Sequence, residues 1–245
     1  MEKYFKPAIS IILLYGTFLY AGAMERQYDI ARKEMVETVK EEIRGTSGYP
    51  GIRKLDQKVI DTMAGVKRHL FVPAAHRYHA YRNRPLPIGY GQTISQPYMV
   101  AVMTDLLKLK DTDIVLEVGT GSGYQAAVLA RIVKKVYTME IIEPLGLEAK
   151  ERLEKLGYDN IEVLIGDGYY GLESKAPFDA VIVTAAAGQI PPPLLKQLKP
   201  EGRMVIPVGS HFFVQHLVLV AKDENGEISI RQIMPVAFVP LTGEH

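Results

Sequence analysis

The first residues whose types and spacing could do chemistry are three glycines preceded by a carboxylate. Gly119, Gly121 and Gly123 follow the apolar run IVLEV, and Glu117 stands two residues before the first glycine. Glycines at a turn from strand to helix let the backbone turn sharply and let a ligand approach the amides at the helix N-terminus. The dinucleotide fingerprint requires a glycine at position 124, where this sequence has Tyr124. The motif therefore predicts a ligand-binding turn of another kind.

Glu117 indicates the charge of that ligand. A carboxylate beside the glycines repels a pyrophosphate and favours a cation. This preference points to the sulfonium and ammonium groups of S-adenosylmethionine. Binding of NAD(P), and a tight turn without any ligand, are the alternatives that the motif leaves open.

Two further carboxylates are predicted at the ends of the next two strands. Glu140 follows the glycines by about twenty residues, where an acidic residue normally holds a ribose diol. Asp167 ends the third strand and could accept a hydrogen bond from an adenine amino group. Either one alone could be a solvated loop carboxylate, but three at successive strand ends share the carboxyl edge, where open α/β sheets bind ligands. The predicted cofactor-binding residues are Glu117, Gly119, Thr120, Gly121, Ser122, Gly123, Glu140, Asp167, Gly168 and Thr184.

The methyl acceptor is restricted by what the chain lacks. There is no Cys, which excludes C5 methylation of a pyrimidine, disulfides and Cys-ligated metals. The fourth strand runs into Thr184-Ala185-Ala186-Ala187 rather than the Asn/Asp-Pro-Pro-aromatic run of base-amine methyltransferases. No His follows a strand of the cofactor half as a general base, and no metal site is predicted. A carboxylate acceptor needs no base, because with a pKa of about 4 it is ionised at pH 7.

These residues require a parallel sheet to position them. Short apolar strands alternate with helices predicted at 124–132, 144–156 and 193–199, which indicates a parallel sheet covered on both faces. The turn Asn225-Gly226 marks an antiparallel hairpin. The predicted fold is α/β, a doubly wound, mostly parallel Rossmann-like methyltransferase sheet that ends in an antiparallel hairpin and carries a helical N-terminal extension.

The first half of the chain is predicted to be helical with one long irregular stretch. Helices are expected at 25–43 and 56–69, followed by a Pro-rich segment, 73–97, without periodicity. Loops of that length in a compact domain are usually functional or disordered, and its Tyr and Leu content argues against disorder. Pro97 begins a helix through Leu107, with Ser95 or Gln96 at the N-cap.

Residues 1–23 form a hydrophobic segment of their own. An uncharged run, 8–23, follows two lysines and ends in Ala21-Gly22-Ala23, a pattern typical of a cleaved signal peptide. The run is just shorter than the ~20 residues that cross a bilayer comfortably. An uncleaved anchor, a packed helix and a start codon at Met24 are the alternatives.

Several stretches together resemble the protein-L-isoaspartate O-methyltransferase family. They lie between about Lys58 and Leu241 and include VKRHLFVPAAHR, LPIGYGQTISQPYMVAVMTDLL, VLEVGTGSGYQAAVLA, GDGYYG, APFDAVIVTAAA and VAFVPL. The second is the most specific, because it is no part of the general cofactor fold. The resemblance implies S-adenosylmethionine-dependent methylation of the free α-carboxylate of isoaspartyl residues in damaged proteins and peptides, with S-adenosylhomocysteine as product. The ester then closes to a succinimide that partly reopens as aspartate.

The resemblance also implies roles for single residues. The serine of QTISQP, here Ser95, is the family's active-site residue, and it could also cap the helix at Pro97. Lys67 and Gln189 depart from residues common in the family, and the N-terminal extension is unusual. The residues implied to line the peptide groove are Pro87, Ile88, Gly89, Thr93, Ile94 and Val239.

The expected organisation is a hydrophobic segment, 1–23, and one methyltransferase domain, 24–245. Within the domain, 24–80 supplies N-terminal helices, 81–110 binds the acceptor, and 111–245 forms the cofactor sheet and hairpin. A net charge of +1 gives no field toward nucleic acid. We expect a cytoplasmic monomer whose membrane contact is restricted to 1–23, with export to the periplasm as the alternative. The rival functions are methylation of another protein or small molecule, and cofactor binding without catalysis.

Overall fold

The computed structural model describes residues 7–210 and 213–243, and the side chains from Gly22 onward within those ranges. Residues 1–6 of the predicted hydrophobic segment lie outside the described residues, and for 7–21 only the helical backbone is described. Within the described part of the chain, no helix is both long enough and apolar enough to cross a membrane.

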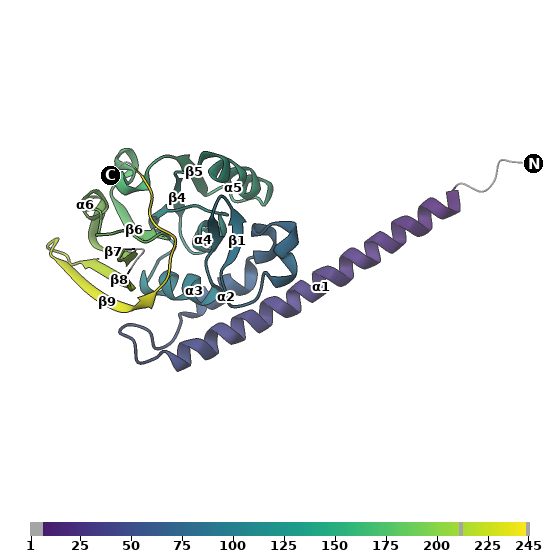
Figure 1. The fold of residues 1–245 in the computed structure, drawn as a ribbon, viewed down its shortest axis with the longest axis horizontal. Helices are drawn as coiled ribbons and strands as arrows, with labels where there is room; N and C mark the ends of the chain where they lie inside the picture. Colours follow the sequence, from purple (N-terminus) through teal and green to yellow (C-terminus); the bar gives the residue numbers. More distant parts are fainter. Residues whose placement is uncertain (1–6, 211–212, 244–245) are drawn as a thin grey trace, which may run out of the picture.

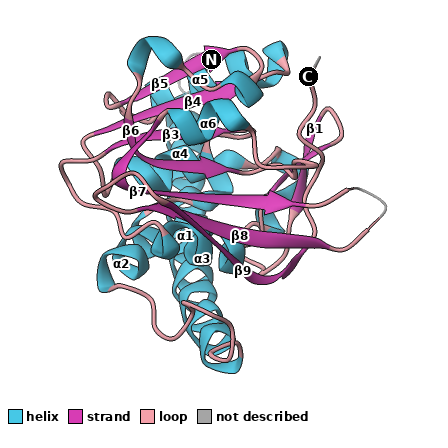
Figure 2. Cartoon of the chain, turned by 90° about the vertical axis from the view of Figure 1, so that its left-hand side faces the viewer, coloured by secondary structure: helices cyan, strands magenta, loops and turns pink. Residues whose placement is uncertain are grey.

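A seven-stranded sheet forms the centre of the fold (Figure 2). Its order is β5-β4-β3-β6-β7-β8-β9, in which β8 runs antiparallel to both neighbours and the other pairs are parallel. The predicted mostly parallel sheet with a terminal antiparallel hairpin is therefore confirmed. The strands are β3 (Ile114–Val118), β4 (Lys135–Glu140), β5 (Ile161–Ile165), β6 (Phe178–Val183), β7 (Leu198–Val208), β8 (Gln215–Lys222) and β9 (Ile228–Val236).

The central strands are buried on both faces because their sequences are nearly continuous apolar runs. Alternate residues face two separate hydrophobic clusters. Val115, Ala180 and Ile182 belong to one cluster, whereas Leu116 and Val181 belong to the other. This alternation holds the strand ends, and the loops that follow them, in a fixed register.

Three short helices connect the parallel strands. They are α4 (Tyr124–Ala130), α5 (Glu143–Lys155) and α6 (Pro192–Lys196), close to the predicted ranges. The last was predicted too long, since Lys199 already lies in β7.

Helix α1 (Pro7–Gly45) has 39 residues and extends away from the sheet at its N-terminal end (Figure 1). The sequence predicted only its second half, as a separate helix at 25–43. Near its C-terminal end the helix buries Met35, Val36, Val39 and Ile43. This half of α1 is therefore part of the hydrophobic core.

The segment between α1 and the sheet differs from its prediction in two places. Helix α2 (Gln57–Gly65) ends earlier than expected, because Val66 adopts an extended conformation. The 3-10 turns Arg68–Phe71 and Ala74–His79 follow. The stretch predicted to be irregular then contains a hairpin of β1 (Leu86–Gly89) and β2 (Gln92–Ile94). Helix α3 (Pro97–Leu106) begins at the proline as predicted.

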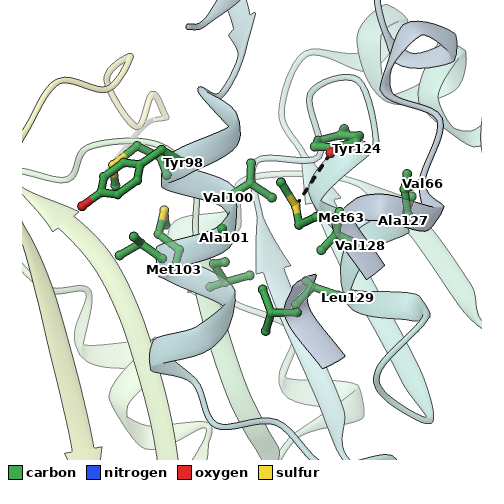
Figure 3. Close-up of a cluster of buried hydrophobic side chains, with 14 of the residues drawn as sticks. Met63, Val66, Tyr98, Val100, Ala101, Met103, Tyr124, Ala127, Val128 and Leu129 are labelled. Carbon is green, nitrogen blue, oxygen red and sulfur yellow. Dashed lines mark hydrogen bonds between the residues drawn. The ribbon is translucent and has the colours of Figure 1, made fainter. Parts of the chain in front are cut away.

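Helix α3 is buried along its whole length and joins the N-terminal helices to the sheet. Figure 3 shows Val100 and Ala101 of this helix in one hydrophobic cluster with Val128 of α4. In the same view the Tyr124 hydroxyl points at the sulfur of Met63, at 3.8 Å. The residues that precede α3 are thereby fixed relative to the glycine turn that precedes α4.

Candidate active site

A cavity opens at the carboxyl ends of the parallel strands. The glycine turn after β3, the end of β4, the end of β6, strand β2 and the C-terminal segment all contribute to its walls. Of the predicted residues, those that line it are Thr93, Ile94, Ser95, Gly119, Thr120, Gly121, Ser122, Glu140, Gly168, Thr184 and Val239. Residues predicted from two distant parts of the chain therefore meet at one site.

The glycine turn is held by hydrogen bonds from both sides. The amides of Gly119 and Thr120 donate to the carbonyl of Met139, at 2.9 and 3.1 Å. Gly119 has a φ of +96°, and a Cβ there would collide with Oγ1 of Thr184. That hydroxyl donates to the carbonyl of Gly119 at 2.6 Å. The close packing of Thr184 on Gly119 explains why a glycine is required at this position.

Glu140 lies at the end of β4, as predicted, and its side chain is nearly buried, with 6% exposed. Its carboxylate accepts hydrogen bonds from the amides of Gly121, at 2.8 Å, and Ile142, at 3.0 Å. A carboxylate has about four lone-pair sites, so it retains the capacity to accept from a ligand hydroxyl. Among the described residues that line this cavity, it is the only charged side chain.

The structure does not bring Glu117 to the cavity. Its side chain is fully buried beneath the glycine turn, where Oε2 accepts a hydrogen bond from Thr138 at 2.6 Å and Oε1 has no partner. Burial raises the pKa of the carboxyl to about 8, against the opposing effect of Thr138. Thr138 in turn contacts Thr120 at 2.7 Å, so Glu117 supports the turn from below.

Asp167 and Gly168 are separated by the structure. Gly168 lines the cavity, whereas Asp167 lies outside its lining. The Asp167 side chain accepts a hydrogen bond from the amide of Tyr169 at 2.9 Å and caps the short turn Gly168–Tyr170. Gly123 also lies outside the lining; it is the N-cap of α4 and has a φ of +84°.

Ser95 lies where the cofactor-side cavity meets a second cavity. Thr93, Ser95, Thr184 and Val239 line both. The expected cap role for Ser95 is wrong: the N-cap of α3 is Gln96, the other residue predicted for this position, and the side chain of Gln96 makes no capping hydrogen bond. Pro97 at the first helical position has no amide hydrogen, and the amide of Tyr98 at the second position donates to Oδ1 of Asn83 at 2.9 Å.

A buried arginine fixes the backbone of Ser95. Nη2 of Arg68 donates to the carbonyl of Ser95 at 2.7 Å, and Nε donates to that of Ala80 at 2.8 Å. The guanidinium carbon lies 4.8 Å from the ring centre of Tyr124. Burial lowers the pKa of Arg68 to about 10, which leaves it cationic at neutral pH. Sequence reasoning missed this residue, although it lies in one of the motifs that carry the resemblance.

The implied peptide-groove residues divide into two groups. Thr93, Ile94 and Val239 line the cavities. Pro87, Ile88 and Gly89 lie in β1 and line neither of the two cavities. Ile88 does not line a cavity because its side chain is buried. It packs close to the glycine turn, since a Cβ added at Gly121 would lie 3.4 Å from the Cδ1 methyl of Ile88.

The C-terminal segment closes one side of the site. The amide of Ala186 donates to the carbonyl of Val239 and that of Leu241 donates to Ala186, both at 2.8 Å. This pairing places Pro240, Leu241 and Thr242 in the lining of the first cavity. From this segment the sequence predicted only Val239.

The lining favours binding and orientation over proton transfer. Neither His nor Lys is present among the described residues that line the two cavities. His69, which is buried, stacks on Tyr28 at 3.9 Å, and burial lowers its pKa to about 4. The described residues contain no group of His, Cys, Asp and Glu that could hold a metal ion. Such a site suits an acceptor that is already ionised.

Comparisons with known proteins agree with this geometry. A protein-L-isoaspartate O-methyltransferase 2 of Syntrophobacter fumaroxidans is 63% identical over 224 residues, which cover 91% of each chain. A protein-L-isoaspartate O-methyltransferase 1 of Nitrosospira multiformis is 55% identical over 247 residues, covering 100% of both.

A solved structure and a family model extend the comparison. The structure is a Plasmodium falciparum chain described as a protein-L-isoaspartate O-methyltransferase, in complex with S-adenosyl-L-homocysteine. It has a TM-score of 0.72 and 26% identity, and the alignment covers 86% of this chain and 98% of that one. The model of the family "Protein-L-isoaspartate(D-aspartate) O-methyltransferase" matches residues 49–245. This chain belongs to that family.

Proposed function

We propose that this chain transfers a methyl group from S-adenosylmethionine to the free α-carboxylate of L-isoaspartyl residues in damaged proteins and peptides. The observation that carries the proposal is the position of Ser95. The loop that is most specific to the family places this residue at the junction of two cavities, one of which opens over the glycine turn. Transfer yields S-adenosylhomocysteine and a methyl ester, whose closure to a succinimide initiates repair to aspartyl.

The first cavity fits the cofactor. Glu140 has spare acceptor capacity for a ribose diol, and the turn from Gly119 to Ser122 presents backbone to the ligand. Gly168 and Thr184 complete the walls on the sides of β5 and β6. The cofactor supplies a methyl group on a positively charged sulfur. Glu117 and Asp167 hold the turns that carry these contacts.

The acceptor carboxylate reacts without a general base. It is ionised at neutral pH, so the protein has to align it with the methyl group and exclude water. Alignment of this kind is worth ~7 to 11 kcal/mol of barrier in well-oriented reactions. The Ser95 hydroxyl donates a hydrogen bond to the carboxylate and orients it, while Arg68 holds the backbone of Ser95 in place.

The decisive experiment compares two peptides that differ only in isoaspartate or aspartate at one position. Radiolabelled methyl transfer to the isoaspartyl peptide and not to its aspartyl twin supports the proposal. Transfer to neither peptide, with cofactor binding intact, favours a cofactor-binding module. Transfer to both peptides, or to a small molecule alone, favours another methyltransferase.

We also propose where the chain acts and how it is organised. Residues 24–245 act as one methyltransferase domain, since α1, α3 and the sheet share one hydrophobic cluster. The domain works as a monomer. It faces the cytoplasm, because the methyl donor is made inside the cell. Cell fractionation tests the location: a mature protein that begins at Met24 in the exported fraction would overturn it.

A further inference from the structure

The second cavity lies on the side of Ser95 that faces the N-terminal helix. It has a volume of about 290 Å³, close to the lower end of the ~300 to 1,000 Å³ of typical ligand pockets. Helices α1 and α3, the end of β9 and the segment that follows β9 form most of its walls. Because it adjoins the proposed acceptor site, a residue next to the isoaspartate in the peptide chain can occupy it.

One carboxylate sets the charge of this cavity. Among the described residues that line it, only Glu42 of α1 is charged; the apolar part of the wall includes Met99, Met234 and Phe238. Glu37 and Glu41 of the same helix pair with Lys40 and Arg44. Glu42 has no ion pair within the part of the chain that the structure describes, and it is half-buried.

Two amides hold the Glu42 side chain in position. Its carboxylate accepts a hydrogen bond from Nδ2 of Asn83 and a longer one, 3.5 Å, from Nε2 of Gln96. Asn83 in turn accepts from the amide of Tyr98 at 2.9 Å. The carboxylate is therefore fixed next to the loop that carries Ser95, yet its charge is not neutralised by a neighbouring cation.

We propose that Glu42 makes the enzyme prefer isoaspartyl peptides with a Lys or Arg side chain beside the isoaspartate, and disfavour those with Asp or Glu there. This inference rests on the proposed function. A cation in the cavity meets the only charge there, of opposite sign, whereas a second carboxylate is repelled by it. Glu42 precedes the matched range 49–245, so the N-terminal extension contributes this selectivity.

The test uses isoaspartyl peptides that are identical except for one residue. Lys, Gln or Glu is placed in turn at the position just before the isoaspartate and at the position just after it, and kcat/KM is measured at low salt for each peptide. We expect the Lys-to-Glu ratio of the wild-type protein to reach about threefold to tenfold at the most sensitive position, as for partly exposed charge pairs. The ratio should fall toward one in 0.5 M salt.

Two variants assign the preference. Glu42→Gln preserves the size of the side chain and one acceptor oxygen, which can still accept from Asn83, but removes its charge, so the ratio should fall close to one. Glu41→Gln, which removes an exposed carboxylate of the same helix turn, should leave it unchanged. A wild-type ratio near one at every position, or a ratio that survives in Glu42→Gln, would overturn the inference while leaving the proposed function intact. Failure to methylate even the Gln peptide would overturn both.

Discussion

At the scale of the residue, Ser95 is the group on which acceptor orientation depends. We expect Ser95→Ala to preserve cofactor affinity and to lower turnover on an isoaspartyl peptide by about 10- to 100-fold, the scale of one lost charge-assisted hydrogen bond. Single-turnover methyl transfer and cofactor titration measure the two quantities. Ser47→Ala, at an exposed position, is the control. An unchanged rate in Ser95→Ala would remove Ser95 from the acceptor site.

Glu140 is proposed to act on the cofactor instead. Glu140→Gln retains one of the two oxygens that accept from the amides of Gly121 and Ile142, replaces the other by a donor, and loses the charge toward the ribose hydroxyls. We expect cofactor affinity to fall about tenfold, whereas the rate at saturating cofactor changes little, because ribose contacts are similar in the ground and transition states. Calorimetric titration and single-turnover rates separate the two effects. An equal loss in both would contradict the ribose role.

Glu117 should affect stability in a pH-dependent way. Its pKa is raised from 4.5 to about 8 in the folded protein, so between these values the folded state binds the proton that the unfolded chain has released. The free energy of unfolding then falls as pH rises, by about 1.4 kcal/mol per pH unit from this group. Glu117→Gln lacks this dependence. Denaturant unfolding without cofactor, from pH 5 to 8, should show the wild type losing stability relative to the variant; a constant difference would contradict the prediction.

The positions of these carboxylates could be predicted from the sequence, but the direction of each side chain could not. Glu117, Glu140 and Asp167 were predicted at or near successive strand ends, and they lie there. Only Glu140 lines the cavity, because Glu117 lies within β3, one residue before its last, and Asp167 turns back to cap its own loop. Strand register and local capping decide such directions, and both depend on neighbours that a single sequence does not reveal.

At the scale of the element, the turn between β3 and α4 forms the base of the cofactor cavity. Gly119→Ala adds a Cβ that collides with Thr184 and also strains a positive φ. We expect cofactor affinity to fall by at least about tenfold, because the turn has to shift. Gly226→Ala is the matched control: its φ is +85°, but no atom lies within 4 Å of the added carbon. It should cost stability without changing cofactor affinity, measured by the same titration; equal affinity losses would indicate general destabilisation.

The elements of the sheet were predictable because apolar runs alternate regularly with helices. The β1–β2 hairpin was not, since its strands have only four and three residues and show no useful periodicity. Its turn also uses Tyr90 at a φ of +52°, where glycine or asparagine would have been the recognisable signal. The full length of α1 was not predicted either. The pattern changes from apolar to amphipathic near residue 24, which suggested the end of one segment and the start of another. The helix nevertheless continues through this point, because only Gly22 lies there to weaken it.

At the scale of the whole molecule, the site is completed by the two ends of the chain. The segment after β9 returns across the sheet to pair with Ala186 and forms one wall. The C-terminal half of α1 contributes core residues and Glu42. The C-terminal segment lines both cavities, whereas Glu42 lines only the second. Helix α1 can therefore alter acceptor binding without altering the residues that line the cofactor cavity.

The two halves of α1 should therefore behave differently when they are removed. Deletion of Met1 to Ala23 leaves Glu25 in contact with Lys67, at 2.5 Å, and leaves Met35 and Val39 in the core. We expect this truncated protein to retain its melting temperature, its cofactor affinity and its methyl transfer to isoaspartyl peptides. Deletion through Arg44 removes the buried residues as well, each of which is worth about 2 to 5 kcal/mol in a core, and should abolish cooperative folding. Thermal unfolding and methyl transfer measured on both proteins decide the matter. If the shorter deletion already abolishes activity while the protein stays folded, the hydrophobic segment takes part in the reaction, and the proposed domain boundary at residue 24 is wrong.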